Sequence, residues 1–263
     1  MNLRSVVVAA LVGVGLLWPV SVSADPVAVR YREGVVHGFL MLRSATGAIL
    51  ASGDLIQVAQ GDRVTSRLVF HFKDGSLQDE TAVFSQRGHF RLVSDHLIQK
   101  GRAFERPLDM TIDGQIGQVT VKYLDEDGQE KTESERMELP PDLANGMIIT
   151  MLKNVRRAGL PATFSFVAAT PKPRLVKLKV TAAGADPFSV AGSARRATHY
   201  VLKVDIGGIS GLLAPLVGKQ PPDSHVWILE GEAPAFVKSE SSLFMGGPLV
   251  RTDLTSPVWP RGR

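Results

Sequence analysis

The residues that could carry acid–base or metal chemistry are the histidines and their acidic neighbours. The histidines form no H-x-H or H-E-x-x-H spacing of the kind that marks a metal site. Asp95 and His96 are the only adjacent acid–imidazole pair, and neighbours in a strand point to opposite faces. The sequence therefore predicts no metal site, no cofactor and no catalytic histidine. The six histidines are His37, His71, His89, His96, His199 and His225.

The sequence contains no clear motif for nucleophilic catalysis. Cysteine is absent, which excludes thiol nucleophiles, disulfides and thiolate metal sites. Residues 207–211, GGISG, approach the G-x-S-x-G elbow, but Gly211 follows Ser210 directly, one place earlier than the motif requires. Residues 125–130, DEDGQE, have the composition of a calcium loop without its alternating oxygen ligands, and a hairpin tip explains them. A hydrolase whose Asp, Glu and His residues are dispersed along the chain stays open as an alternative.

The first residues predict export. Arg4 precedes an uncharged apolar run over residues 5–20, and Val22, Ser23 and Ala24 form a small-residue cleavage site. We expect residues 1–24 to be a signal peptide cleaved after Ala24, with an uncleaved membrane anchor as the alternative. No later run is long enough to span a bilayer, so we expect a soluble protein in the periplasm or outside the cell.

Charge argues against nucleic acid as a partner. The net charge is +4, and the 30 basic residues are scattered among 26 acidic ones without forming a basic block. Removing 24 of the 263 residues leaves 239, enough for a sizeable core without disulfide or metal support.

Most of the chain has the alternation of β-strands. In residues 64–73, for example, Leu68, Phe70 and Phe72 alternate with more polar neighbours, and Asp74–Gly75 then predicts a hairpin turn. Residues 130–138 are charged, as in a solvated edge strand, and residues 183–193 are expected to form a loop. The expected strands are residues 36–43, 49–59, 64–73, 77–86, 89–98, 119–123, 130–138, 163–169, 174–181, 199–206, 226–230, 235–240 and 249–254.

One helix is expected between two halves of the sheet, at about residues 142–158. Its apolar residues lie on one side of a helical wheel, and Gly159 and Pro161 would end it. Asn145 and Gly146 are poor helix formers, so the regular helix could instead begin with Asn145 as its cap. The apolar residues of the wheel are Leu143, Met147, Ile148, Met151, Leu152 and Val155.

These elements predict a mainly β fold, a curved antiparallel sheet or half-open barrel whose helix packs on or plugs the concave side. We expect a single domain over residues 25–255, with sheet halves at about 35–139 and 162–255 that meet through the helix. Residues 256–263 would form a loose tail.

The C-terminal hairpin carries a resemblance. His225–Val226–Trp227–Ile228–Leu229, a turn, and Pro234–Ala235–Phe236–Val237–Lys238 resemble a signature of exported bacterial β-sheet proteins of unknown function. They are similar, more distantly, to the periplasmic lipoprotein carriers. The matching motif lies within about the last quarter of the chain. The resemblance implies a half-open sheet with a helix on its concave side, able to hold acyl chains. It does not identify any individual ligand-binding residue in this chain.

The expected function is non-catalytic binding or carriage of a hydrophobic ligand, with a lipid or a lipoprotein acyl chain as the partner. An apolar segment at residues 209–217, ISGLLAPLV, would be a core-capping flap or a lid over the ligand. An envelope scaffold without a small ligand is a further alternative. The expected ligand contacts are Phe70, Phe72, Met147, Met151, Leu212, Leu213 and Leu216.

Overall fold

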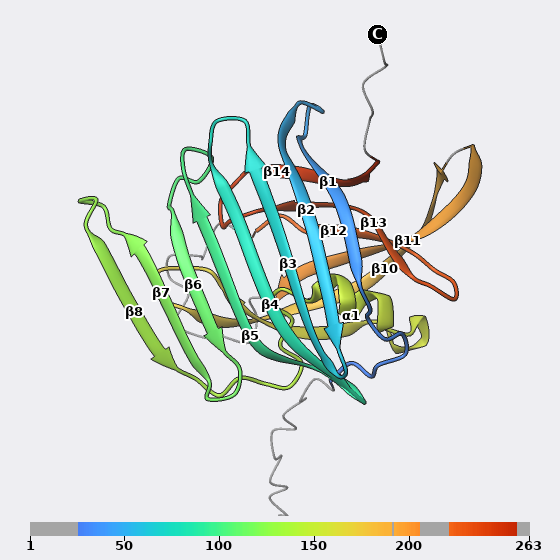
Figure 1. The fold of residues 1–263 in the computed structure, drawn as a ribbon, viewed down its shortest axis with the longest axis horizontal. Coiled ribbons are helices and arrows are strands. Elements are labelled where there is room, and N and C mark those ends of the chain that lie inside the picture. Colours follow the sequence, from blue (N-terminus) through green and yellow to red (C-terminus); the bar gives the residue numbers. More distant parts are fainter. Residues whose placement is uncertain (1–25, 191, 206–220, 257–263) are drawn as a thin grey trace, which may run out of the picture.

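The computed structural model describes residues 26–190, 192–205 and 221–256 (Figure 1). Fourteen strands form one antiparallel sheet in the order β8-β7-β6-β5-β4-β3-β2-β1-β14-β13-β12-β11-β10-β9. Their bounds are β1 Val36–Ser44, β2 Ile49–Gln60, β3 Arg63–Phe72, β4 Leu77–Arg87, β5 His89–Lys100, β6 Leu108–Asp113, β7 Gln118–Leu124, β8 Glu130–Arg136, β9 Ala162–Ala168, β10 Arg174–Val190, β11 Ser193–Asp205, β12 Ser224–Leu229, β13 Ala235–Ser242 and β14 Leu249–Thr255.

The two halves of the sheet are joined by hydrogen bonds between their first and last strands. β1 and β14 pair from Phe39↔Thr255 to Ser44↔Val250, so the expectation that the halves meet through the helix was wrong. The sheet stays open, with β8 and β9 as its two edges. The prediction of a curved, open, mainly β fold with one helix is confirmed, and the charged segment that was expected to be an edge strand is β8.

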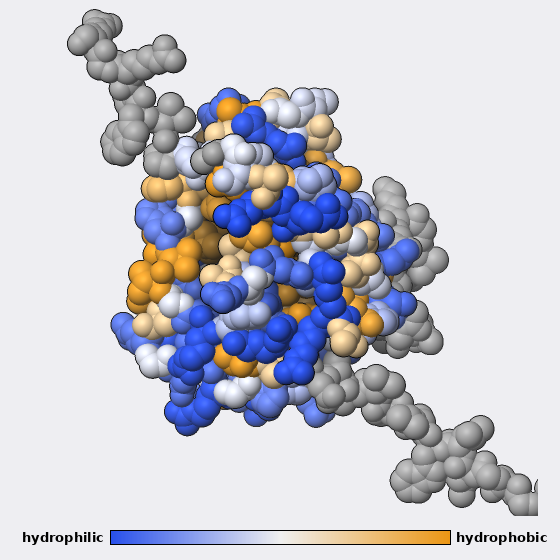
Figure 2. Space-filling model, turned by 90° about the vertical axis from the view of Figure 1, so that its right-hand side faces the viewer, coloured by the Kyte–Doolittle hydropathy of each residue, from blue (hydrophilic) through white to orange (hydrophobic). Residues whose placement is uncertain are grey.

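Alternation along the strands puts one set of side chains into a shared core. On β4, Ala82 and Phe84 are buried, and on β5 so are Leu92 and Leu97. The core cluster also contains Phe164 and other residues of β9 to β14, so both halves of the sheet bury their apolar side chains together. Figure 2 shows hydrophilic side chains over much of the surface, with hydrophobic ones gathered between them.

The helix α1, Ile148–Asn154, is shorter than the expected range of residues 142–158. Gly146 has φ of 63°, and a Cβ there would lie 2.4 Å from the Cβ of Ala82, so a glycine fits this close approach. Asn145 does not cap the helix. Its side chain donates to the Val167 carbonyl at 2.9 Å and accepts from the Val167 N–H at 2.8 Å. Tertiary contacts therefore hold residues 142–146 out of the helix, and a 3₁₀ turn, Arg157–Gly159, follows it.

Two further expectations about strands were wrong. Residues 183–193 are largely paired, because β10 continues to Val190 and β11 begins at Ser193, with Ala185 opposite Thr198. The small residues there belong to a projecting two-stranded arm rather than a loop. β6 was missed, although Leu108, Met110 and Ile112 are buried in alternation with more exposed neighbours.

Removing the anchor of the segment before α1 should weaken the fold. Asn145→Ala would leave the buried N–H and C=O of Val167 without their side-chain partner, and we expect a loss of about 2–4 kcal/mol in the free energy of unfolding. Urea unfolding measures this loss. Gln115→Ala, which truncates an exposed turn residue, is the matched control, and equal stability of the two variants would contradict the role given to Asn145.

Candidate ligand-binding site

An apolar cavity of about 390 Å³ opens where the ends of two strands and two connecting segments meet. The start of β2, the end of β3, the loop after β5 and the β13–β14 turn each contribute part of its wall. Its volume lies within the roughly 300–1,000 Å³ typical of small-molecule sites. The lining residues are Ile49, Leu50, Phe72, Lys73, Asp74, Ala103, Leu243, Phe244, Pro248 and Val250.

Three aromatic rings form a connected series beside this cavity. The ring centroids of Phe72 and Phe104 are 5.5 Å apart with an interplanar angle of 78°. Those of Phe104 and Phe244 are 5.8 Å apart at 62°. Both contacts are edge-to-face, a favourable arrangement for aromatic side chains. The rings thus tie the end of β3 to two separate loops and make one wall of the cavity aromatic.

Polar side chains beneath the cavity fix the loops that form it. The Ser76 hydroxyl accepts from the Ala103 N–H at 2.9 Å, which holds the loop after β5 against the β3–β4 turn. The Gln99 side chain donates to the Leu243 carbonyl at 2.8 Å and to Gln78 Oε1 at 3.0 Å. Backbone groups on two sides of the cavity therefore have fixed partners, and the shape of the cavity is supported from below.

The rim of the cavity carries two charges with different surroundings. Asp74 Oδ1 accepts from the Ser76 N–H at 2.9 Å, and hydrogen bonds from Ser76 hold the pKa of Asp74 below its usual value. Lys73 is exposed and makes no ion pair with any described residue. Its ammonium is left available at the mouth of an otherwise apolar space.

The expected contact residues are divided between core and cavity. Phe72 lines the cavity, whereas Phe70, Met147 and Met151 are at most 2% exposed and pack in the core without lining it. Leu212, Leu213 and Leu216 lie outside the described residues. The ligand-binding role of all seven residues stays a prediction.

Sequence reasoning missed Phe104 and Phe244, the two loop aromatics. Each lies in a segment with turn residues nearby, within residues 101–107, GRAFERP, and 242–248, SLFMGGP. A lone large aromatic in such a segment needs somewhere to bury its ring, and that was the available signal.

A second group of interest is the pair of carboxyls formed by Glu80 and Asp95. Ala82 pairs with Asp95 and Glu80 with Leu97, so both carboxyls lie on the inner face of adjacent strands. Asp95 is 1% exposed, and its oxygens make no hydrogen bond of good geometry to a described residue. Burial raises the pKa of Glu80 to about 7, while burial and the Glu80 charge raise the pKa of Asp95 well above its usual value. Neither residue lines the apolar cavity.

This pair should make the fold less stable as the pH rises. Because the folded-state pKa of Glu80 is above its ordinary value of 4.5, the native state keeps this proton where the unfolded chain has lost it. Stability therefore falls as the pH rises from about 4.5 to about 7, and it levels off above that. Glu80→Gln should flatten that fall and raise stability above neutral pH by up to about 3 kcal/mol. Urea unfolding across the pH range measures this. Glu133→Gln, on exposed β8, is the control, and curves that fall equally in both variants would contradict the assignment.

A cluster on the outer face contains two of the histidines. His199 Nε2 and His225 Nδ1 share a hydrogen bond of 2.8 Å. The His199 ring stacks on Trp227 with centroids 4.2 Å apart, and Lys238 lies over the same indole at 3.9 Å. The indole N–H donates to Asp186 at 2.7 Å, which ties the arm of β10 and β11 to the sheet. Burial is the main cause that lowers the pKa of His199. The cluster is a set of mutually satisfied strand side chains, as the alternation predicts.

Fold and site together define an open, curved β-sheet protein with a short inner helix and an apolar cavity at one end. No helix in the described ranges is long and apolar enough to cross a membrane. A scan against models of protein families finds no match, and no curated protein matches the sequence. Among solved structures, the chain is similar to a "Beta-barrel-like Protein of Domain of Unknown Function DUF1849 from Brucella abortus", with a TM-score of 0.46, 10% identity, 87% of this chain and 99% of that chain covered. A likeness this distant does not place the chain in that family.

Proposed function

We propose that this protein is an exported, non-catalytic binding or carrier protein for a hydrophobic ligand such as a lipid or a lipoprotein acyl chain. The observation that carries the proposal is the apolar cavity of about 390 Å³ with Phe72 and Phe244 in its wall. Binding there works by shape and by removal of apolar surface from water, without a chemical step.

The energetics suit one end of an acyl chain. Each buried methylene contributes about 0.8 kcal/mol, so five or six of them contribute roughly 4–5 kcal/mol before the costs of association. The exposed Lys73 at the rim would lie near an anionic head group if a fatty acid entered tail first. An amphiphile whose head group can accept a hydrogen bond from the Lys73 ammonium therefore fits the cavity better than a neutral hydrocarbon.

Export is part of the same proposal. Residues 1–24 act as a signal peptide cleaved after Ala24, and residues 25–255 form one domain that works in the periplasm or outside the cell. This location would place the apolar cavity where lipids and lipoproteins pass between membranes. Whether residues 209–217 cover the ligand is left to experiment, because they lie outside the described residues.

Filling the cavity should abolish binding of an apolar probe. Ala103→Phe places a ring in the space that the ligand would occupy, and we expect at least a tenfold loss of affinity for N-phenyl-1-naphthylamine, measured by fluorescence titration. Ala45→Phe, at an exposed turn, is the matched control and should bind the probe as the unmodified protein does. Thermal melts check that both variants fold.

Two results would contradict the proposed ligand-binding function. The first is equal probe affinity in Ala103→Phe and the unmodified protein, which would put the probe elsewhere. The second is the absence of both probe binding and co-purified lipid, the latter assessed by mass spectrometry of gently purified protein.

A further inference from the structure

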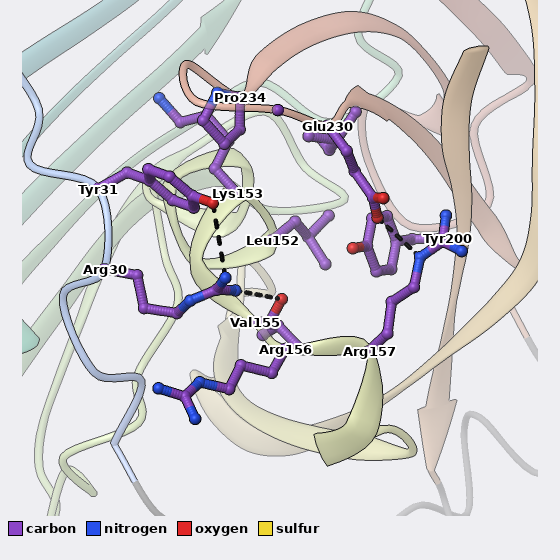
Figure 3. Close-up of a pocket in the computed structure, with 12 residues that line it drawn as sticks. Arg30, Tyr31, Leu152, Lys153, Val155, Arg156, Arg157, Tyr200, Glu230 and Pro234 are labelled. Atoms are coloured by element: carbon purple, nitrogen blue, oxygen red, sulfur yellow. Dashed lines mark hydrogen bonds and ion pairs between the residues drawn. The ribbon is translucent and has the colours of Figure 1, made fainter.

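A second cavity, of about 290 Å³, lies where the segment before β1, the end of α1 and the β12–β13 turn come together (Figure 3). Its wall differs from that of the apolar cavity, because charged and phenolic side chains surround a small apolar floor. The lining residues are Arg30, Tyr31, Leu152, Lys153, Val155, Arg156, Arg157, Tyr200, Ile228, Glu230, Gly231 and Pro234.

Tyr200 supplies a hydroxyl that reaches the cavity without a protein partner. The residue is 2% exposed, and no described residue makes a hydrogen bond to its oxygen. Figure 3 shows the hydroxyl directed into the cavity, toward Leu152. Burial, and then the charge of Glu230, raise the pKa of Tyr200, so at neutral pH the hydroxyl keeps its proton. The hydroxyl is therefore a donor without a protein acceptor, and the cavity is the place from which an acceptor can come.

Two of the four cations around the cavity are already paired. Lys153 Nζ lies 2.5 Å from Glu33 Oε1, and both side chains are largely buried. Arg157 Nε lies 2.8 Å from Glu230 Oε1, which also accepts from the Thr198 hydroxyl at 2.6 Å. The acidic side chains near the cavity are therefore neutralised by partners of their own.

The other two cations are left in excess. Arg156 is exposed and makes no ion pair with any described residue. The Arg30 guanidinium donates only long hydrogen bonds, at 3.4 Å to the carbonyls of Asn154 and Val155 and at 3.5 Å to the Tyr31 hydroxyl. Its guanidinium keeps the capacity to bind an oxyanion. The Arg30 guanidinium and the Tyr200 hydroxyl thus face one small space, while the Arg156 side chain leads away from Tyr200 and adds a second uncompensated positive charge at the outer rim (Figure 3).

We propose that this cavity binds a phosphate group, as free phosphate or as a phosphate ester. The guanidinium group of Arg30 and the hydroxyl of Tyr200 donate to the phosphate oxygens, and Arg156 at the outer rim supplies a second positive charge. Two excess charges match a phosphate dianion better than a carboxylate, and a guanidinium and a hydroxyl from two separate segments can donate to different oxygens of the group. Leu152 and Ile228 form the floor on which the organic part of an ester would lie.

Calorimetric titration of the full chain tests this proposal with inorganic phosphate, phenyl phosphate and benzoate at constant ionic strength. Tyr200→Phe keeps the ring and removes the donor, and Arg156→Gln removes an exposed charge. Tyr200→Phe should weaken phosphate binding about tenfold or more, since a hydrogen bond to a charged group is lost, and Arg156→Gln should weaken it severalfold, since an uncompensated positive charge is lost. Tyr123→Phe on β7 and Arg91→Gln on β5 are matched controls and should leave the affinity unchanged.

Each outcome of the titration either supports or overturns the proposed phosphate site. Phosphate binding that falls in both cavity variants and not in the controls supports the site, and tighter binding of phenyl phosphate identifies an ester as the ligand. Benzoate binding as tight as phenyl phosphate, affinities that Tyr200→Phe leaves unchanged, or no binding of any phosphate overturns it. Binding of N-phenyl-1-naphthylamine to Tyr200→Phe should be unaltered, so this result is independent of the proposed lipid site.

Discussion

The pairing of β1 with β14 is the interaction on which the rest of the structure depends. Each half of the chain is an antiparallel run of strands with one apolar face, and neither run can bury that face alone. Pairing from Phe39↔Thr255 to Ser44↔Val250 makes the two runs one sheet. The first and last strands of the described chain are then in its middle, and β8 and β9 become its edges. Curvature brings the two apolar faces into a common core.

This topology also explains the polar interior. The chain must pass from one edge, β8, to the other, β9, and the connecting segment lies against β9. Leu143 forms a parallel bridge with Ser165, and the Ser165 hydroxyl donates to the fully buried Asp142 at 2.7 Å. Lys177 lies 3.6 Å from the same carboxylate and offsets its charge. The edge of β9 is thereby covered, which removes a site at which another chain could pair.

Both cavities occur where turns and termini meet, away from the middle of the sheet. Strand side chains on the inner face fill the centre, so Met147 and Met151 pack there as core residues. The connecting segments cannot fill the space between them so completely. One such place is apolar and aromatic, and the other is ringed by cations. Different loop residues on one scaffold thus produce two kinds of binding surface.

The sequence by itself determined the strand-rich class, most strand positions, the charged edge strand and the presence of one helix within residues 142–158, because alternation and helical periodicity are local signals. Only the tertiary structure decided the β1–β14 pairing, the start of the helix after Gly146 instead of at residue 142, and most residues of both cavities. Phe104 and Phe244 are over 100 positions apart in the chain, and so are Arg30 and Arg156. Such residues come together only when the sheet curves and its loops pack, and no local pattern in the sequence predicts contacts between positions so far apart.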